Sequence, residues 1–454
     1  MGTAASAGEF LRGTPHVHRT IESGARFRAF GPRQLDEIVR RYPMAAEVRD
    51  TVRIFSRVLP FRINEYVLDE LIDWSRIPED PMFQLVFPQP GMLSDEHAAA
   101  LRALDGRADT DPGVTAVVRR IRAELNPHPG GQLNLNIPRR DGAAIPGLQH
   151  KYRETVLYFP SQGQTCHAYC TYCFRWAQFV GDADLRFAAP GPDVLVGYLR
   201  EHPEVNDVLV TGGDPAVMSA DRLRGHLQPL LGVPTLRVIR IGTKSPAYWP
   251  QRFVTDPDAD DLLRLFCEIV GSGRTLAVMA HFSHDHEIVS PMAEKAISRI
   301  RSTGAVVYCQ APLIAHVNDD PDVWSSLWRA EIAAGCVPYY LFVARDTGPH
   351  DYFRVPLDRA AGIFAEAYRR LPGLARTVRG PVMSTEAGKV VVDGAGGGSF
   401  QLRFLQARDP GLVGRPFLAH GSPDAAWITD LTPHPDNPAD LRHALTHAET
   451  EVTA

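Results

Sequence analysis

The chain has 454 residues, of which 44% are hydrophobic, 22% charged and 9% aromatic. This composition is that of a globular protein and excludes a disordered or collagen-like chain. The formal net charge of −5 argues against a nucleic-acid partner. No apolar run reaches the roughly 18 residues of a membrane span, and residues 1–20 lack the apolar core of a signal peptide. We therefore expect a cytoplasmic protein with no membrane partner.

Residues 1–145 predict a helical and irregular N-terminal region. Residues 1 to about 25 look like a flexible tail. Helical periodicity with charged faces follows over 32–58 and again over 92–105, with a proline-interrupted stretch between them. Prolines and glycines at 127–131 mark a break before the next region.

Residues 146–371 alternate between short β-rich runs and amphipathic helices. Strands that are apolar on both faces and alternate with helices indicate parallel β/α units. Six such units favour an α/β fold with a partial (β/α)6 TIM-like barrel over a doubly wound sheet. The strands are expected at 154–159, 206–212, 236–242, 275–280, 304–310 and 337–343. The helices are expected at 193–202, 219–231, 258–270, 291–302, 322–334 and 357–371.

Residues 372–454 predict a C-terminal extension. It begins with the loop sequence STEAGK at 384–389. Two β-rich runs, at 389–394 and 400–406, predict a hairpin. The tail from about 421 is rich in proline and aspartate, and we expect it to cap the fold or to be mobile.

Three of the six cysteines form the spacing Cys-x3-Cys-x2-Cys directly after the first barrel strand: Cys166, Cys170 and Cys173. Three thiolates in so short a loop can hold three corners of a [4Fe–4S] cube. The open iron can then bind S-adenosylmethionine (SAM), whose reductive cleavage yields a 5′-deoxyadenosyl radical. A zinc site is the alternative, but its fourth ligand would have to be His167 with poor local geometry. The other cysteines are expected in the core: Cys267, Cys309 and Cys336.

Polar residues cluster after the strand ends, where β/α barrels build their active sites. They are Gly212, Gly213, Asp214, Thr243, Lys244, His281, Gln310, Arg345 and Asp346. With the cysteine motif, this pattern resembles the radical SAM superfamily, and within it the lysine 2,3-aminomutase family. The resemblance covers roughly 59–389 in family order. It is carried by the segments 59–81, 145–152, 165–176, 208–215, 240–252, 280–287, 310–319 and 338–356.

The resemblance implies a role for individual residues. The three motif cysteines would hold the cluster. The SAM-binding residues would be Tyr172, Gly212, Gly213, Asp214, His281 and Gln310. Tyr172 would lie against the adenine, and the glycines would let the backbone approach the SAM amino group. A purely structural His281 is the open alternative. Arg175 would grip the substrate α-carboxylate with its guanidinium fork.

Family aminomutases also carry pyridoxal 5′-phosphate (PLP) on a lysine. The π-system of the PLP imine stabilises the radical while nitrogen migrates. Of the four lysines in the chain, Lys389 lies at about the matching position. The resemblance assigns Lys151 and Tyr152 to the PLP phosphate. Two departures stand out, because the glycine run before the lysine is missing and a family phosphate-binding arginine aligns with Thr155.

The residues expected at the distal end of the substrate also differ from the family pattern. In the lysine enzymes an aspartate after the sixth strand pairs with the distal amine, and the match puts Arg345 there with Asp346 next. A cation would repel lysine and favour an anionic or hydrogen-bond-accepting group, as in a glutamate-type aminomutase. A shift of the alignment by one residue would place Asp346 there instead and reverse this inference. The second amine-binding carboxylate of the family has no clear equivalent near residues 382–384. Since no cysteine follows Cys336, the C-terminal zinc site of some relatives is not expected.

The leading hypothesis is a radical SAM, PLP-dependent amino acid 2,3-aminomutase, an isomerase. It implies an amino acid as the small-molecule substrate, an electron donor such as flavodoxin or ferredoxin, and a homo-oligomer. The alternative is a PLP-independent member of the same family that acts on another small metabolite or peptide. A non-enzymatic iron–sulfur regulator would not need the Gly-Gly-Asp turn or Gln310.

Overall fold

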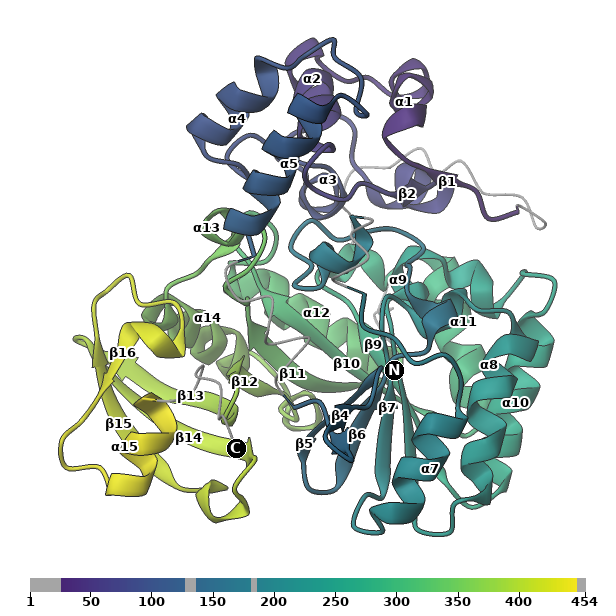
Figure 1. The fold of residues 1–454 in the computed structure, drawn as a ribbon, viewed down its shortest axis with the longest axis vertical. Helices are drawn as coiled ribbons and strands as arrows, with labels where there is room; N and C mark the ends of the chain where they lie inside the picture. Colours follow the sequence, from purple (N-terminus) through teal and green to yellow (C-terminus); the bar gives the residue numbers. More distant parts are fainter. Residues whose placement is uncertain (1–25, 127–135, 181–185, 447–454) are drawn as a thin grey trace, which may run out of the picture.

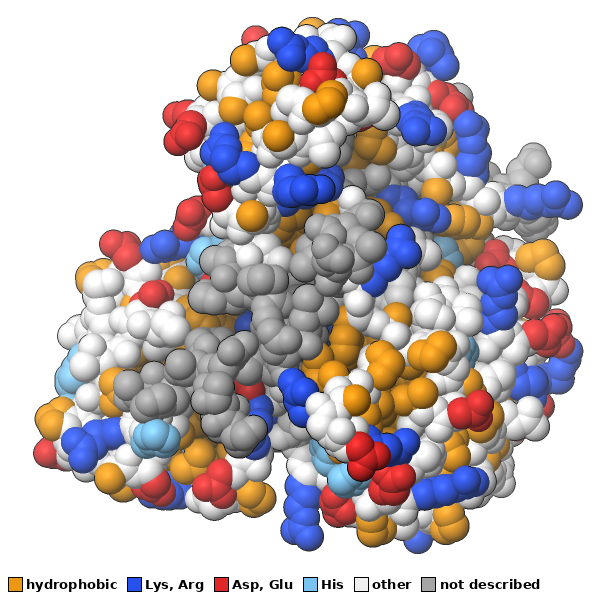
Figure 2. Space-filling view, in the orientation of Figure 1, with side chains coloured by type: hydrophobic (Ala, Val, Ile, Leu, Met, Phe, Trp, Pro, Cys, Tyr) orange, Lys and Arg blue, Asp and Glu red, His pale blue; other side chains and the backbone are white. Residues whose placement is uncertain are grey.

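The computed structural model describes residues 26–126, 136–180 and 186–446 (Figure 1). The predicted tail before residue 26 and the predicted break at 127–131 lie outside these ranges. Figure 1 shows the N-terminal helices above a long central sheet, with outer helices on one side and the C-terminal strands on the other. In the space-filling view, basic and acidic side chains are mixed over the N-terminal region and the outer helices (Figure 2).

The N-terminal region is helical, as predicted. Its helices are α1 (Leu35–Arg41), α2 (Ala46–Phe55), α3 (Pro81–Val86), α4 (Asp95–Arg102) and α5 (Pro112–Glu124), with a π-helical turn at Val67–Leu71. Two short strands, β1 (Ala29–Phe30) and β2 (Ile63–Asn64), pair antiparallel. Asp80, Ser94 and Asp111 begin α3, α4 and α5, since each side chain accepts a backbone N–H of the first turn.

The central feature is a mixed 12-stranded sheet in the order β16-β15-β14-β13-β12-β11-β10-β9-β8-β7-β6-β5. Strands β6 to β12 are parallel. They are β6 (Thr155–Tyr158), β7 (Asp207–Val210), β8 (Val238–Thr243), β9 (Thr275–His281), β10 (Val306–Leu313), β11 (Val337–Val343) and β12 (Arg379–Ser384). The helices between them are α7 (Asp193–Glu201), α8 (Ala220–Leu227), α9 (Ser245–Tyr248), α10 (Ala259–Gly271), α11 (Pro291–Ser302), α12 (Pro321–Ala333), α13 (His350–Phe353) and α14 (Leu357–Arg369). The predicted alternation of strands and helices is confirmed.

The count of six parallel strands was one too low, because β12 is a seventh. It pairs parallel to β11. Its sequence, RGPVMS, contains a glycine and a proline, which argue against a central strand on sequence grounds alone. Gly380 is needed there, since a Cβ atom would lie 2.8 Å from the Leu341 carbonyl oxygen on β11.

The C-terminal extension continues the same sheet. Strands β13 (Gly388–Gly396) and β14 (Ser399–Ala407) form the predicted hairpin, and β15 (Pro416–Gly421), β16 (Leu431–Pro433) and α15 (Ala439–Thr446) follow. At the other end, β5 (Leu148–Tyr152) pairs antiparallel with β6 and contacts β14. This contact brings the β5 edge of the sheet close to its C-terminal strands. A small hairpin, β3 (Arg139–Arg140) with β4 (Ala143–Ala144), precedes β5.

Side-chain alternation along β7 and β8 separates the core from the site. Val208 and Val210 on β7, and Ile239 on β8, are fully buried in the main hydrophobic core, where each stabilises the fold by about 1.5–3 kcal/mol. Asp207 and Arg240 alternate with them on the other face and pair with each other. None of the described helices is long and apolar enough to cross a membrane.

Candidate functional site

The cysteine motif forms a loop directly after β6 that the N-terminal region holds from above. The Tyr169 N–H donates to the Arg62 carbonyl at 2.9 Å, and the Thr171 N–H donates to the Leu85 carbonyl at 2.8 Å. The cysteines therefore lie between the carboxyl end of the sheet and the N-terminal helices.

The three motif thiols are unpaired and close together. Burial raises the pKa of Cys166 and Cys170, and raises the pKa of Cys173 to about 12. The charges of Cys170 and Cys173 raise the pKa of Cys166, and the charge of Cys170 raises that of Cys173, which places the sulfurs within electrostatic reach. Buried neighbouring thiols of this kind need a cationic partner to ionise. The donor set fits three corners of an iron–sulfur cube.

One ring nitrogen of His167 is used in a hydrogen bond to the loop after β8. Its Nδ1 donates to the Ser245 hydroxyl at 2.8 Å, and that hydroxyl donates to Asp214 at 3.0 Å. Its ring packs edge-on against Phe27 at 5.0 Å. Burial lowers the pKa of His167 to about 3. The histidine inside the motif thus links the cysteine loop to the end of β8.

The Gly-Gly-Asp turn after β7 crosses the cysteine loop at very short range. A Cβ atom on Gly213 would lie 2.4 Å from the Thr165 carbonyl oxygen, one residue before Cys166. Gly212 has a φ of +147°, in the region that favours glycine. Glycine is therefore needed here first of all because the two loops lie in contact. Their role toward the SAM amino group stays a prediction.

Asp214 organises the same turn. Its buried carboxylate accepts hydrogen bonds from Thr243 Oγ1 at 2.7 Å, the Lys244 N–H at 2.8 Å and the Ala216 N–H at 2.9 Å, besides the Ser245 hydroxyl. With all these donors on one side chain, Asp214 joins the ends of β7 and β8. It acts as a positioning residue for the loop after β8.

A buried ion pair that the sequence analysis did not assign lies beside these loops. Lys244 Nζ is 2.6 Å from Glu287 Oε1 and 4.6 Å from the centre of the Tyr248 ring. The positive charge of Lys244 acts on the pKa of Cys170, so the pair belongs to the surroundings of the cluster. The only available sequence signal was a lysine directly after a strand.

His281 and Gln310, both predicted SAM residues, are brought together. They occupy paired positions on β9 and β10, and the Gln310 amide donates to Nε2 of His281 at 3.2 Å. Burial, with Lys244 and Arg175 nearby, lowers the pKa of His281 to about 3. His281 is therefore a neutral imidazole. Tyr172 reaches the same edge, with its hydroxyl 3.1 Å from that of Ser283.

Arg175 lies against the Gly-Gly-Asp turn. Its Nη1 donates to the Gly212 carbonyl at 3.1 Å, and its guanidinium carbon is 4.3 Å from the centre of the Phe159 ring. Burial lowers the pKa of Arg175 to about 10, although Cys173 and Cys166 raise it. The guanidinium is thus held between the cysteine loop and the turn.

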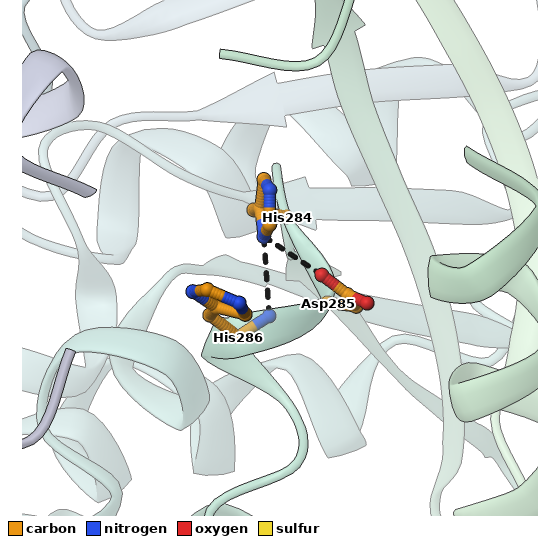
Figure 3. Close-up of side chains that lie close together, drawn as sticks. All are labelled: His284, Asp285 and His286. Atoms are coloured by element: carbon orange, nitrogen blue, oxygen red, sulfur yellow. Dashed lines mark hydrogen bonds and ion pairs between the residues drawn. The ribbon is translucent and has the colours of Figure 1, made fainter. Parts of the chain in front are cut away.

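The turn after β9 carries a compact His284-Asp285-His286 group (Figure 3). One ligand atom of each lies within 4.8 Å of the others, and this is the only such group of three or more in the described chain. Nδ1 of His284 lies 2.8 Å from Asp285 Oδ1 and 3.3 Å from the His286 backbone nitrogen. Asp285 also accepts the Ser326 hydroxyl at 2.6 Å. We assign these contacts to shaping the turn.

Lys389, the predicted PLP lysine, lies at the start of β13. Its Nζ donates to Gln406 Oε1 at 2.6 Å and is 4.9 Å from the centre of the Tyr152 ring and 5.3 Å from that of Tyr340. Burial, followed by the charges of nearby basic side chains, lowers the pKa of Lys389 to about 7. About half of the amine is therefore neutral at pH 7, and a nucleophilic lysine needs such a neutral fraction.

The basic side chains around Lys389 come from three different strands. They are Arg240 on β8, Lys151 on β5 and Arg379 on β12, and the acidic group Asp207 acts in the opposite direction. Arg240 binds Asp207 with two contacts of 2.8 and 2.6 Å. Thr155 supports Asp207 with a hydrogen bond of 3.2 Å. The Lys151 ammonium donates to the Thr385 carbonyl.

Two buried phenols at this place have no hydrogen-bond partner among the described residues. They are the hydroxyls of Tyr152 and Tyr340. Tyr339 lies next to Tyr340 and acts on its pKa, but the two hydroxyls do not reach hydrogen-bonding geometry. Orphaned buried hydroxyls beside several cations are suited to an anion. We call this cluster of side chains the Lys389 pocket: Lys389, Tyr152, Tyr340, Lys151, Arg240 and Arg379. It suits PLP, with an amine for the aldehyde and cations for the phosphate.

The two candidate substrate residues follow β11. Arg345 Nη1 donates to the Ser384 carbonyl at the end of β12, at 3.0 Å, and its guanidinium carbon is 5.5 Å from the centre of the Trp427 ring. The Arg345 carbonyl accepts from Nδ1 of His350 at 3.1 Å. Asp346 is half-buried. The choice between Arg345 and Asp346 as the distal substrate contact stays a prediction.

No protein-family profile matches the chain. The chain is 33% identical over 290 residues to a "Putative L-lysine 2,3-aminomutase" of Aquifex aeolicus. The match covers 63% of this chain and 75% of that protein. The chain belongs to the lysine 2,3-aminomutase family. The L-lysine 2,3-aminomutase of Bacillus subtilis is 29% identical over 276 residues, covering 60% of this chain and 54% of that one.

The family consists of radical SAM enzymes, and the chain is a radical SAM enzyme related to the lysine 2,3-aminomutases. Among solved structures, Streptococcus suis SuiB bound to precursor peptide SuiA overlaps 60% of this chain and 56% of its own. The TM-score of 0.35 and the identity of 14% are too low for this likeness to bear on the fold or the function.

Proposed function

We propose that the protein is a radical SAM 2,3-aminomutase that moves the amino group of an amino acid between C2 and C3, with PLP carried on Lys389. The observation that supports this most is the Lys389 pocket. A buried lysine with a lowered pKa, two unpartnered tyrosine hydroxyls and several basic side chains meet on strands of the same sheet that carries the cysteine loop.

The bound groups supply the radical chemistry: the [4Fe–4S] cluster and SAM supply a 5′-deoxyadenosyl radical, and PLP supplies a π-system for the migrating nitrogen. Cys166, Cys170 and Cys173 would hold the cluster. An external one-electron donor such as flavodoxin or ferredoxin would reduce it. SAM would lie along Tyr172, the Gly-Gly-Asp turn, His281 and Gln310.

The remaining residues of the chain would bind and orient the substrate. Arg175, already desolvated beside the cysteine loop, would take the α-carboxylate as a bidentate partner. Arg345 would face the distal end and favour a glutamate-like molecule over lysine. Lys389 in its neutral form would hold the cofactor, and neutral His281 would add no charge beside SAM.

A PLP-independent enzyme of the same family is the competing function. It would leave the Tyr152 and Tyr340 hydroxyls without a purpose, and it would not need a lysine whose pKa is about 7. These two observations favour the PLP-dependent reaction.

The test is covalent trapping. The anaerobically reconstituted protein is mixed with PLP, reduced with borohydride and digested, and the modified peptide is identified by mass spectrometry. We expect the adduct on Lys389 and its loss in Lys389→Ala. The matched control is Lys295→Ala on α11, which should keep the adduct. Screening amino acids with SAM and reductant for a β-amino acid product then identifies the substrate. An untrapped wild type that still cleaves SAM would favour the PLP-independent reaction.

A further inference from the structure

The basic side chains near Lys389 exceed the acidic ones. Arg240 is neutralised by Asp207, whereas Arg379 has no acidic partner among the described residues. Its guanidinium carbon instead lies 4.3 Å from the centre of the Tyr340 ring and 4.5 Å from that of Tyr339. The other nearby acid, Glu386, is paired with Arg408. One full positive charge is therefore held over the phenol with the orphaned hydroxyl.

The geometry points to a phosphate-monoester site in which Arg379 and Tyr340 bind the phosphate group, Tyr152 completes it from β5, and Arg240 is a positioning residue behind them. This inference rests on the proposed function, because PLP is the ligand assumed for the site. It assigns to Arg379, Tyr340 and Arg240 a role that the sequence comparison did not suggest.

Three observations carry this assignment independently of the pKa of Lys389. Tyr340 and Tyr152 are 2% and 9% exposed, and each hydroxyl lacks a partner. Arg379 and Tyr340 occupy paired positions on β12 and β11, so they share one face of the sheet. Both phenol rings lie about equally close to Lys389 Nζ, at 4.9 and 5.3 Å.

The chemistry of the ligand agrees with this donor set. A phosphate monoester carries between one and two negative charges near neutral pH, and its oxygens accept several hydrogen bonds. A guanidinium offers a planar fork to such a group. Two phenol O–H donors would fill the remaining positions. The Asp207 pair with Arg240, supported by Thr155, keeps a second guanidinium in place without adding net charge.

The experiment compares PLP with pyridoxal, which has the same aldehyde but no phosphate, on the reconstituted full chain. The dissociation constant of each is measured by absorbance for the wild type, Arg379→Gln and Tyr340→Phe. We expect Arg379→Gln to weaken PLP binding about 10- to 100-fold, the range for a charged hydrogen bond. Tyr340→Phe should weaken it about fivefold. The titrations are run well above pH 7, where the Lys389 amine is neutral, so neither substitution should change pyridoxal binding.

Arg224→Gln, which removes an exposed ion pair with Glu268 on the outer helices, is the matched control and should leave both constants unchanged. Inorganic phosphate should compete with PLP in the wild type and less so in Arg379→Gln. Equal losses for PLP and pyridoxal, or no loss for PLP, would overturn the assignment.

Failure of the phosphate site and failure of the proposed function are distinguishable. If the wild type traps PLP on Lys389 while Arg379→Gln and Tyr340→Phe bind PLP normally, only the phosphate site is wrong. If the wild type traps no PLP, the proposed cofactor is wrong. The phosphate site is then tested by inorganic phosphate alone, as a thermal stabilisation that Arg379→Gln abolishes, and the absence of that stabilisation rejects it.

Discussion

Gln310 on β10 and Tyr340 on β11 occupy paired positions in the parallel sheet. Gln310 is also paired with His281 on β9, and Tyr340 with Arg379 on β12. Since paired residues of neighbouring strands share a face, one row of side chains runs from the predicted SAM residues to the Lys389 pocket. A radical formed at one end of this row and a substrate held at the other would lie on the same side of the sheet.

The first prediction concerns the cluster. Replacing Cys166, Cys170 or Cys173 with Ala should abolish both iron binding and 5′-deoxyadenosine formation, because each is expected to hold one corner. Cys267 on α10 is exposed, whereas the sequence analysis expected it in the core. Cys267→Ala is therefore the control and should retain both. Iron content and chromatography of the nucleoside measure the effect. Full activity in the triple alanine variant would refute the cluster assignment.

Gly213→Ala should displace the cysteine loop. The added Cβ would lie 2.4 Å from the Thr165 carbonyl oxygen and 2.5 Å from its nitrogen, and overpacking of this kind costs about 1–3 kcal/mol. We expect a lower melting temperature and less bound iron. Gly225→Ala in α8 is the control, since a Cβ there meets nothing within 4 Å and should be neutral or stabilising. Unchanged iron content in Gly213→Ala would contradict the close crossing of the two loops.

Asp214→Ala should weaken SAM binding while the cluster remains. The substitution leaves Thr243, Ser245 and two backbone N–H groups without their acceptor, and each buried unsatisfied donor costs about 1–3 kcal/mol. The loop after β8 would then lose its order. Equilibrium dialysis reports SAM binding, and the visible absorbance of the protein reports the cluster. If SAM binds with wild-type affinity, Asp214 only stabilises the fold.

The pH dependence of adduct formation should report the lowered pKa of Lys389. The neutral amine attacks, so the rate with pyridoxal should rise with pH up to about 7 and level off above it. A lysine with the ordinary pKa would keep accelerating toward pH 10. Arg379→Gln removes one of the positive charges that lower this pKa and should move the midpoint to higher pH. A midpoint near 10 in the wild type would contradict the burial of Lys389.

The charge of the substrate follows from Arg345. Two unit charges 4 Å apart interact by about 4 kcal/mol at an effective dielectric constant near 20, enough to disfavour a lysine ammonium beside a guanidinium. Glutamate should therefore trigger 5′-deoxyadenosine formation better than lysine in a competition, and Arg345→Asp should reverse the preference. If lysine is the better trigger for the wild type, Asp346 is the distal contact.

Sequence reasoning located the features that depend on residues close together in the chain. The Cys166-x3-Cys170-x2-Cys173 spacing identified the cluster loop, and the periodicity of apolar residues placed the strands from β6 to β11 close to their observed bounds. Lys389 was identified because its segment lies at about the position of the family's PLP lysine and the chain offers only three other lysines. Each of these signals lies within a few residues, where local spacing alone limits what the backbone can do.

Only the tertiary structure brought together residues that are far apart in the chain. Arg240 and Arg379 lie 139 positions apart in sequence (379 − 240), yet both act on Lys389. Likewise, Gly213 meets Thr165, and Lys244 pairs with Glu287. Strand β12 escaped prediction because its Gly380-Pro381 pair opposes a strand locally, whereas pairing with β11 and β13 stabilises it. The composition of the Lys389 pocket was therefore decided by strand order and register, which no local pattern encodes.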